Sequence, residues 1–145
     1  MAAPARALLS HLPKGHRLPD TRFQITTDEI ARYMNAVGDT NPLYLERGLA
    51  PPLAVAARAL GAVLETIELP AGALHTGQEV EAHAGVPIGS TLTLSGRIAQ
   101  RSERAGLIIS VIEFEATPEG APTLAVTGRT TVMAPASAST AGGAT

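Results

Sequence analysis

The sequence contains no cysteine, no tryptophan and few aromatic residues of any kind. Without cysteine there is no disulfide framework, thiolate metal site or cysteine nucleophile. Two phenylalanines and two tyrosines are too few for the stacking platforms that bind single-stranded nucleic acid. The formal net charge is −2 and lysine and arginine form no run, so the basic footprint of a phosphate-backbone binder is missing. We therefore expect no nucleic-acid partner.

The sequence also has no apolar run long enough to suggest a membrane span. Its most apolar stretch, Leu53–Leu69, would form a helix of roughly 25 Å, which is short for a bilayer. The first twenty residues lack the apolar core and small-residue cleavage site of a signal peptide. We expect a cytoplasmic protein that forms one domain, because 145 residues suffice for a single core.

The stretch Leu53–Leu69 is the element around which the rest of the chain is expected to fold. It carries a single charge before position 65, which predicts a helix that is apolar on all sides and therefore buried. Pro51 and Pro52 stand at its start, where a missing N–H costs little, and Pro70 follows its end. Gly61 lies in its middle and costs about 1 kcal/mol relative to alanine, which suggests close approach of another backbone.

The segments on either side predict an antiparallel sheet. Residues 1–20 hold three prolines and are expected to form a flexible N-terminal arm. A short strand at Arg22–Ile25 precedes a helix that starts after Thr26 or Thr27 and ends at Gly38. Beyond Pro70 the apolar residues recur with period two, and short turns with glycine or proline separate the runs. The expected strands are Leu74–His83, Thr91–Ala99, Leu107–Ala116 and Leu124–Met133. We place the domain at residues 21–133 and a disordered tail at 134–145.

The run Leu107–Ile112, LIISVI, is apolar on both faces, with Ser110 its one polar residue, which predicts a central strand covered on both faces. A single alanine-rich helix can cover only one face of the sheet. The second cover is most simply another copy of the sheet or a related subunit, so we predict a dimer.

The connection Gly38–Pro52 is about twice the usual length for a link between helices, and long structured connections are often functional. It contains the string GDTNPLY. A helix that ends in this string, followed by a helix wrapped by an antiparallel sheet, resembles the MaoC-like branch of the hot-dog fold. The resemblance runs from Phe23 to Met133, and His75–Ile98 is similar to the second-strand region of the N-terminal-type domains of that family.

The resemblance implies an α+β hot-dog fold, with about five antiparallel strands wrapped around the buried central helix. It also implies the activity of (R)-specific enoyl-thioester hydratases and 3-hydroxyacyl-thioester dehydratases, which need a base, an acid and donors for an enolate-like oxygen. The family supplies an Asp and a His five positions apart, with backbone N–H groups at the start of the buried helix. Asp39 takes the Asp position here, and Asn41 is the adjoining polar residue.

This sequence departs from the family at two places. Tyr44 occupies the His position, and a phenol ionises only near pH ~10, whereas imidazole exchanges its proton near pH ~6.5. Pro51 and Pro52 replace the usual His-Gly at the helix entrance and remove two N–H donors beside Leu53. We take Asp39, Asn41 and Tyr44 as candidate catalytic residues, and Pro51, Pro52 and Leu53 as candidate substrate-binding residues.

These departures leave three functions open. The first is a subunit of an acyl-thioester hydratase or dehydratase that shapes the acyl tunnel while a partner subunit carries the complete Asp and His pair. The second is a self-sufficient homodimer that uses Asp39, with Tyr44 or a water in place of the His. The third is a non-enzymatic protein that binds acyl-thioesters. The substrate would be an acyl-CoA or acyl-carrier thioester in each case, the assembly a homodimer or heterodimer, and no cofactor is expected.

Other candidate sites are weaker. His75, Glu79, Glu81 and His83 lie along one strand, where they are too far apart to converge on one metal ion. Arg97, Arg101 and Arg104 could meet the phosphates of a CoA or carrier arm, but a solvated edge explains them more simply. A hot-dog thioesterase would need a carboxylate on the buried helix, and Glu65 stands near the wrong end. Asp39 also has a plain alternative role, as a turn residue whose carboxylate binds nearby backbone N–H groups.

Overall fold

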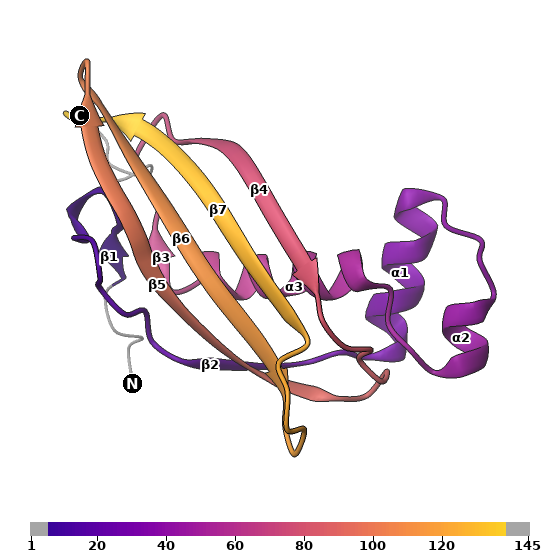
Figure 1. Ribbon diagram of the computed structural model, residues 1–145. Helices are drawn as coiled ribbons and strands as arrows, with labels where there is room; N and C mark the ends of the chain where they lie inside the picture. The colour runs from indigo at the N-terminus through magenta and orange to yellow at the C-terminus, as the bar shows by residue number, and fades with distance from the viewer. Residues whose placement is uncertain (1–5, 139–145) are drawn as a thin grey trace, which may run out of the picture.

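The computed structural model describes residues 6–138, in which a curved sheet packs over one helix (Figure 1). The sheet is antiparallel, has five strands, and runs in the order β2-β5-β6-β7-β4. Its strands are β2 (Thr21–Gln24), β4 (Leu74–Ala82), β5 (Thr91–Arg104), β6 (Leu107–Pro118) and β7 (Val126–Pro135). The predicted α+β architecture with about five strands is confirmed.

Helix α3 (Pro52–Leu64) is the central helix, with Pro52 in its first turn as predicted. It ends earlier than the sequence indicated. The Thr66 hydroxyl donates to the Val63 carbonyl at 2.7 Å, and Ile67–Glu68 then forms β3, which pairs in parallel with β1 (Ala7–Leu8). The residues that follow the helix therefore pair with a strand that lies far away in the sequence.

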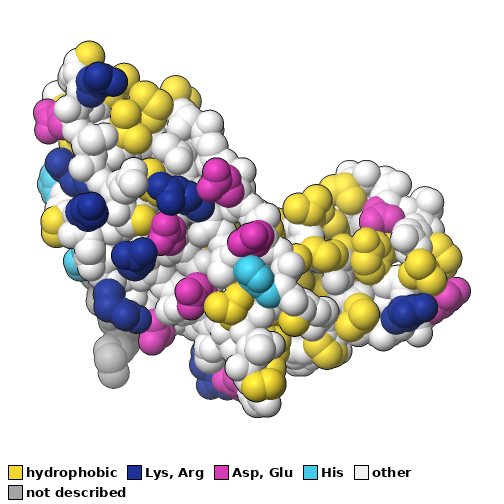
Figure 2. All heavy atoms as spheres, viewed as in Figure 1, with side chains coloured by type: hydrophobic (Ala, Val, Ile, Leu, Met, Phe, Trp, Pro, Cys, Tyr) yellow, Lys and Arg dark blue, Asp and Glu magenta, His cyan; other side chains and the backbone are white. Residues whose placement is uncertain are grey.

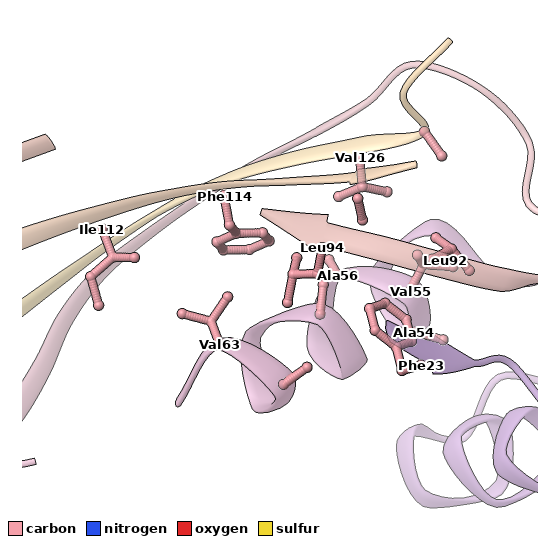
Figure 3. Packing of buried hydrophobic residues seen from close by; sticks show 14 of the residues in the cluster. Phe23, Ala54, Val55, Ala56, Val63, Leu92, Leu94, Ile112, Phe114 and Val126 are labelled. Atoms are coloured by element: carbon pink, nitrogen blue, oxygen red, sulfur yellow. The ribbon is translucent and has the colours of Figure 1, made fainter. Parts of the chain in front are cut away.

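The face of α3 that meets the sheet is lined by small apolar side chains (Figure 3). The buried residues of the helix are Ala54, Val55, Ala56, Ala59, Ala62 and Val63. Ile112, Phe114 and Leu94 of the sheet point toward it. The prediction of a helix buried all round is wrong, because Leu53 is 64% exposed and Ala57 is also exposed. The sheet wraps only one side of the helix.

The N-terminal segment differs from the flexible arm expected from its prolines. Leu9 begins a 3₁₀ turn (Leu9–His11) and is 1% exposed, and Leu12 and Leu18 also belong to the core. The Arg101 guanidinium donates from Nε and Nη2 to the Ser10 carbonyl at 3.1 and 3.0 Å. The described part of this segment is thus a packed component of the domain, and residues 1–5 lie outside the described range.

At the other end of the chain, β7 continues two residues past the expected boundary at Met133, and Ala136 N–H donates to the Gly106 carbonyl at 2.8 Å. The remainder of the expected tail, from residue 139 on, lies outside the described residues. Strand β6 is the central strand, as predicted. The face of the sheet turned away from α3 is charged at its middle, where Glu113 pairs with Arg97 at 2.7 Å and with Arg129 at 3.0 Å.

Two helices lie beyond the N-terminal end of α3, to one side of the sheet (Figure 1). Helix α1 (Thr27–Val37) starts at a capping box, in which the Thr26 hydroxyl accepts from Glu29 N–H and the Glu29 carboxylate accepts from Thr26 N–H. Ile30 and Met34 anchor it to the core. Helix α2 (Leu43–Arg47) is a single short turn with no buried residue.

Replacing Thr26 by alanine should lower the free energy of unfolding by about 1 kcal/mol, because it removes the cap of the helix that leads into the candidate site. Urea denaturation of the variant checks this value. Thr26→Ser keeps the hydroxyl and should stay close to the parent chain. Equal loss of stability in both variants would show that the methyl group matters rather than the cap.

Candidate functional site

The connection between α1 and α3 begins with a reversal of the chain at Gly38. This residue has a left-handed backbone with φ of 72°, which suits glycine, and it ends α1 as predicted. Asp39 N–H donates to the Met34 carbonyl at 2.8 Å, so the backbone of the candidate residue is held against the last turn of the helix. This arrangement directs the chain away from α1 and toward α2.

The polar side chains of GDTNP build the turn that follows. One carboxylate oxygen of Asp39 accepts from Asn41 N–H at 2.9 Å, and the Asn41 side-chain oxygen accepts from Leu43 N–H at 3.0 Å. Both are hydrogen bonds between residues two apart, the pattern of successive Asx turns. Asp39 is half-buried and Asn41 is exposed. The structure therefore assigns each of them a structural task in the connection.

Tyr44 lies in α2 and is half-buried, with its side chain packed against the core cluster. Its carbonyl accepts from Leu49 N–H at 2.9 Å, which closes the short helix. Among the described residues, no hydrogen bond joins the Tyr44 hydroxyl to Asp39. The Tyr44 phenol is therefore positioned by packing against the core and not by a hydrogen bond to the Asp39 carboxylate.

The start of α3 has few free backbone donors. The Pro51 carbonyl accepts from Ala54 N–H at 3.0 Å and from Val55 N–H at 3.2 Å. Pro51 is buried and Pro52 is exposed, and neither has an N–H. Leu53 is consequently the first residue of α3 with a backbone N–H to offer. A site that stabilised an oxyanion here would have one donor from this residue and none from the two before it.

The structure brings a second loop to this connection, which sequence reasoning missed. Ala50 N–H donates to the Val86 carbonyl at 2.8 Å, and Ile88 N–H donates to the Gly48 carbonyl at 2.8 Å. The loop after β4 is thereby tied to the link between α2 and α3. Long-range backbone bonds of this kind leave no periodic signal in the sequence.

A cleft of about 290 Å³ opens between α1 and α3. Its lining is mostly apolar and comprises Ile25, Glu29, Ile30, Tyr33, Ala54, Ala57 and Arg58. The Arg58 guanidinium lies 5.1 Å from the centroid of the Phe23 ring, and its Nε is 3.7 Å from Glu29 Oε1. The sequence feature that could have pointed to this cleft is Arg58, because it is the one charge on an otherwise apolar helix. Asp39 and Tyr44 do not line this cleft.

Two of the three arginines considered for phosphate binding have partners within the domain. Arg97 pairs with Glu113, and Arg101 donates to the Ser10 carbonyl. A register shift between His75 and Gly77 interrupts the alternation that would align His75 with Glu79. Residues 6–138 contain no group of three or more His, Asp or Glu side chains placed to hold a metal ion. Over the same range, no helix is long and apolar enough to cross a membrane.

The model of the FAS1-like dehydratase domain region family matches residues 13–120. The chain belongs to this family. The matched range covers the capping box, the GDTNP connection, α3 and the sheet through β6, so it includes the candidate site and most of the framework. No curated protein sequence matches the chain significantly.

Solved structures of hydratases and dehydratases share the fold of this chain. The unliganded R-hydratase PhaJ1 of Pseudomonas aeruginosa is 16% identical, with a TM-score of 0.74 over 94% of this chain and 91% of that chain. The (R)-hydratase of A. caviae is 20% identical, with a TM-score of 0.69 over 84% and 96%. The C-terminally truncated HadBC complex of Mycobacterium tuberculosis, a 3R-hydroxyacyl-ACP dehydratase, is 19% identical, with a TM-score of 0.68 over 87% and 100%. These likenesses confirm the hot-dog fold.

Proposed function

We propose that this chain is a subunit of an acyl-thioester hydratase or dehydratase, in which it shapes the acyl tunnel while a partner subunit supplies the complete Asp and His pair. The substrate class is a 2-enoyl-CoA or an enoyl-carrier thioester. In hydration, a base takes a proton from water, the oxygen bonds to C3, and a proton is delivered to C2. The reverse sequence removes water from the 3-hydroxyacyl thioester.

The main support is a dehydratase-family fold whose own catalytic set is incomplete. Tyr44 stands where the family has its His, and one carboxylate oxygen of Asp39 already accepts a hydrogen bond from Asn41 N–H. The entrance of α3 offers its first N–H only at Leu53. An acid–base pair contributes roughly 10²–10⁴-fold to such reactions, and one member is absent from this chain.

In the proposed assembly the polar residues of the connection have secondary roles. Asp39 and Asn41 hold the turn that faces the partner, and Tyr44 offers a hydroxyl donor beside it. Pro51, Pro52 and Leu53 border the entrance where the thioester would pass. The HadBC structure is a complex of a 3R-hydroxyacyl-ACP dehydratase, which supports a two-chain arrangement for this fold. The dimer expected from the sequence is retained here as part of the proposal.

The test is a hydration assay with crotonyl-CoA on the purified chain, alone and mixed with a hot-dog subunit that carries Asp and His at the motif spacing. The chain alone should turn over at no more than about one hundredth of the rate of the mixture, because it lacks the second member of the acid–base pair. The mixture should also exceed the partner subunit alone.

Asp39→Asn provides the matched control, because the asparagine side-chain oxygen can still accept from Asn41 N–H while the charge is removed. In the mixture this variant should retain most of the rate. Strong turnover by the chain alone that is lost in Asp39→Asn would instead establish a self-sufficient enzyme. Acyl-CoA binding by calorimetry, with no turnover in any combination, would establish a binding protein.

A further inference from the structure

The cleft between α1 and α3 lies directly beyond the entrance that the proposed function assigns to the thioester. Leu53 carries the first backbone N–H of α3, and Ala54, Ala57 and Arg58 of the same helix line the cleft. These three lining residues are spaced i, i+3 and i+4, so they share one face of the helix. From Leu53 to Arg58 the helix rises about 7.5 Å. A ligand group held by Arg58 would therefore lie several atoms along the acyl chain from the thioester carbonyl.

Small side chains keep this cleft open. Apart from Arg58, α3 presents only alanines to it, Ala54 and Ala57. Ile25 and Ile30, which are both buried, supply further apolar lining from the chain just before α1 and from α1 itself. The volume of about 290 Å³ is close to the lower limit of small-molecule sites, roughly 300 Å³. The space suits a short acyl group.

The surroundings of the cleft are apolar, which gives weight to its few polar groups. Figure 2 shows hydrophobic side chains predominating over the lobe that α1 and α2 form, whereas charged side chains spread over the sheet. Three of the lining residues carry polar groups: Glu29, Tyr33 and Arg58. Electrostatic interactions and hydrogen bonds are stronger where apolar atoms replace water. These three groups therefore decide which ligand the cleft accepts.

The Arg58 guanidinium is charged but has no hydrogen-bond acceptor of its own. Its side chain is 36% exposed, and its Cζ lies over the Phe23 ring, 5.1 Å from the centroid. Its Nε is 3.7 Å from Glu29 Oε1, a separation that balances the charge but is too long for a hydrogen bond. Within residues 6–138 its five N–H donors form no hydrogen bond. They can donate to an incoming oxygen.

Tyr33 adds a second donor from the facing helix. It follows Glu29 by four residues on α1, so the two side chains lie on the same face. Tyr33 is half-buried against the core cluster, and across the described part of the chain its hydroxyl forms no hydrogen bond. One carboxylate oxygen of Glu29 accepts from Thr26 N–H at 3.4 Å, and the other faces Arg58. The cleft thus offers unused donors and carries no net charge.

We propose that this cleft binds the distal part of the acyl group, and that Arg58 and Tyr33 select a group that is apolar except for one uncharged oxygen, a ketone or a hydroxyl. The inference rests on the proposed function and names the class of acyl substrate. A plain alkyl group would leave both donors without an acceptor in a partly desolvated site. A carboxylate would bring a second negative charge close to Glu29, which already balances Arg58.

Isothermal titration calorimetry on the purified chain tests this selection with three thioesters of equal chain length: hexanoyl-CoA, 5-oxohexanoyl-CoA and adipoyl-CoA. Beyond the thioester, the first carries no oxygen, the second a ketone and the third a carboxylate. The ketone should bind about tenfold more tightly than the other two, the effect of one charge-assisted hydrogen bond. Arg58→Met, which keeps the apolar stem but removes the N–H groups, should abolish this preference, and Tyr33→Phe should reduce it.

Two further variants separate the cleft from a general effect of charge. Arg32→Met makes the same change at an exposed position of α1 outside the cleft and should keep the preference for the ketone. Glu29→Gln retains a side-chain acceptor for the Thr26 cap but removes the negative charge. It should therefore raise the affinity for adipoyl-CoA about tenfold, because Arg58 is then free to pair with the carboxylate.

The outcomes distinguish this inference from the proposed function. Equal binding of the three thioesters, tighter binding of adipoyl-CoA by the parent chain, or a ketone preference that survives Arg58→Met would overturn the inference and leave the proposed function in place. No binding of any thioester would overturn both. Because binding is measured without a partner subunit, a failed hydration assay beside an intact ketone preference would overturn only the proposed function.

Discussion

Replacing Gly128 by alanine is expected to destabilise the protein by about 3 kcal/mol, the upper end of the usual cost of overpacking a core. A Cβ at this position would lie 2.1 Å from Cζ and 2.4 Å from Cε1 of Phe114. Phe114 is opposite Gly128 in the sheet and is 1% exposed, so a Cβ at Gly128 would force this buried ring to shift within the core. The Phe114 ring lies across β7 at Gly128, where no side chain stands in its way. Urea denaturation measures the loss.

Gly61→Ala is the matched control, because no atom outside the helix backbone lies within 4 Å of a Cβ built there. The close approach of another backbone that the sequence suggested at Gly61 is therefore wrong. Alanine at a helix interior should stabilise the chain by up to about 1 kcal/mol. The same chemical change should therefore act in opposite directions at the two positions. Combining Gly128→Ala with Phe114→Leu should restore part of the stability, since the smaller side chain frees the contested space. Additive losses in the double variant would contradict the explanation.

Replacing Leu9 by alanine is the second change with a large expected effect. Its side chain is 1% exposed in the core cluster, so truncation should cost about 3 kcal/mol, within the range of roughly 2–5 for such changes. His11 is exposed two residues later, and His11→Ala should change stability by less than about 0.5 kcal/mol. Thermal or urea unfolding separates the two variants.

The Leu9 result also distinguishes two descriptions of the N-terminal segment. A segment that only lies over the surface would tolerate Leu9→Ala as easily as His11→Ala. A large difference between the variants shows that residues near the N-terminus close the end of the core beyond α3. An equal, small effect would contradict the packed arrangement.

Much of the fold was predictable because the governing signals are local. The proline pair, the alanine-rich run and the capping residues locate α3 and α1, and period-two alternation locates the long strands. Gly38 was predictable as a helix end, because a left-handed backbone there favours glycine. The GDTNP string also indicated both the turn and the family resemblance.

The errors arose where a distant partner decided the conformation. Ile67 and Glu68 continue an apolar run after α3, yet they form β3 because β1 lies beside them. Leu9, Leu12 and Leu18 appear in a proline-rich segment and are nevertheless buried by the sheet and α3. No local pattern announces either result, because each depends on pairing or burial against residues far along the chain.

The sequence by itself determined α1, α3 and the five strands of the main sheet, the acid at position 39 and the absence of a histidine at position 44. Only the tertiary structure decided that the Asp39 and Asn41 side chains are used to build their own turn, and that one side of α3 stays uncovered. The reason is physical: side-chain chemistry and short-range periodicity are written along the chain, whereas burial, cross-strand pairing and the surface left for a partner depend on which distant segments meet.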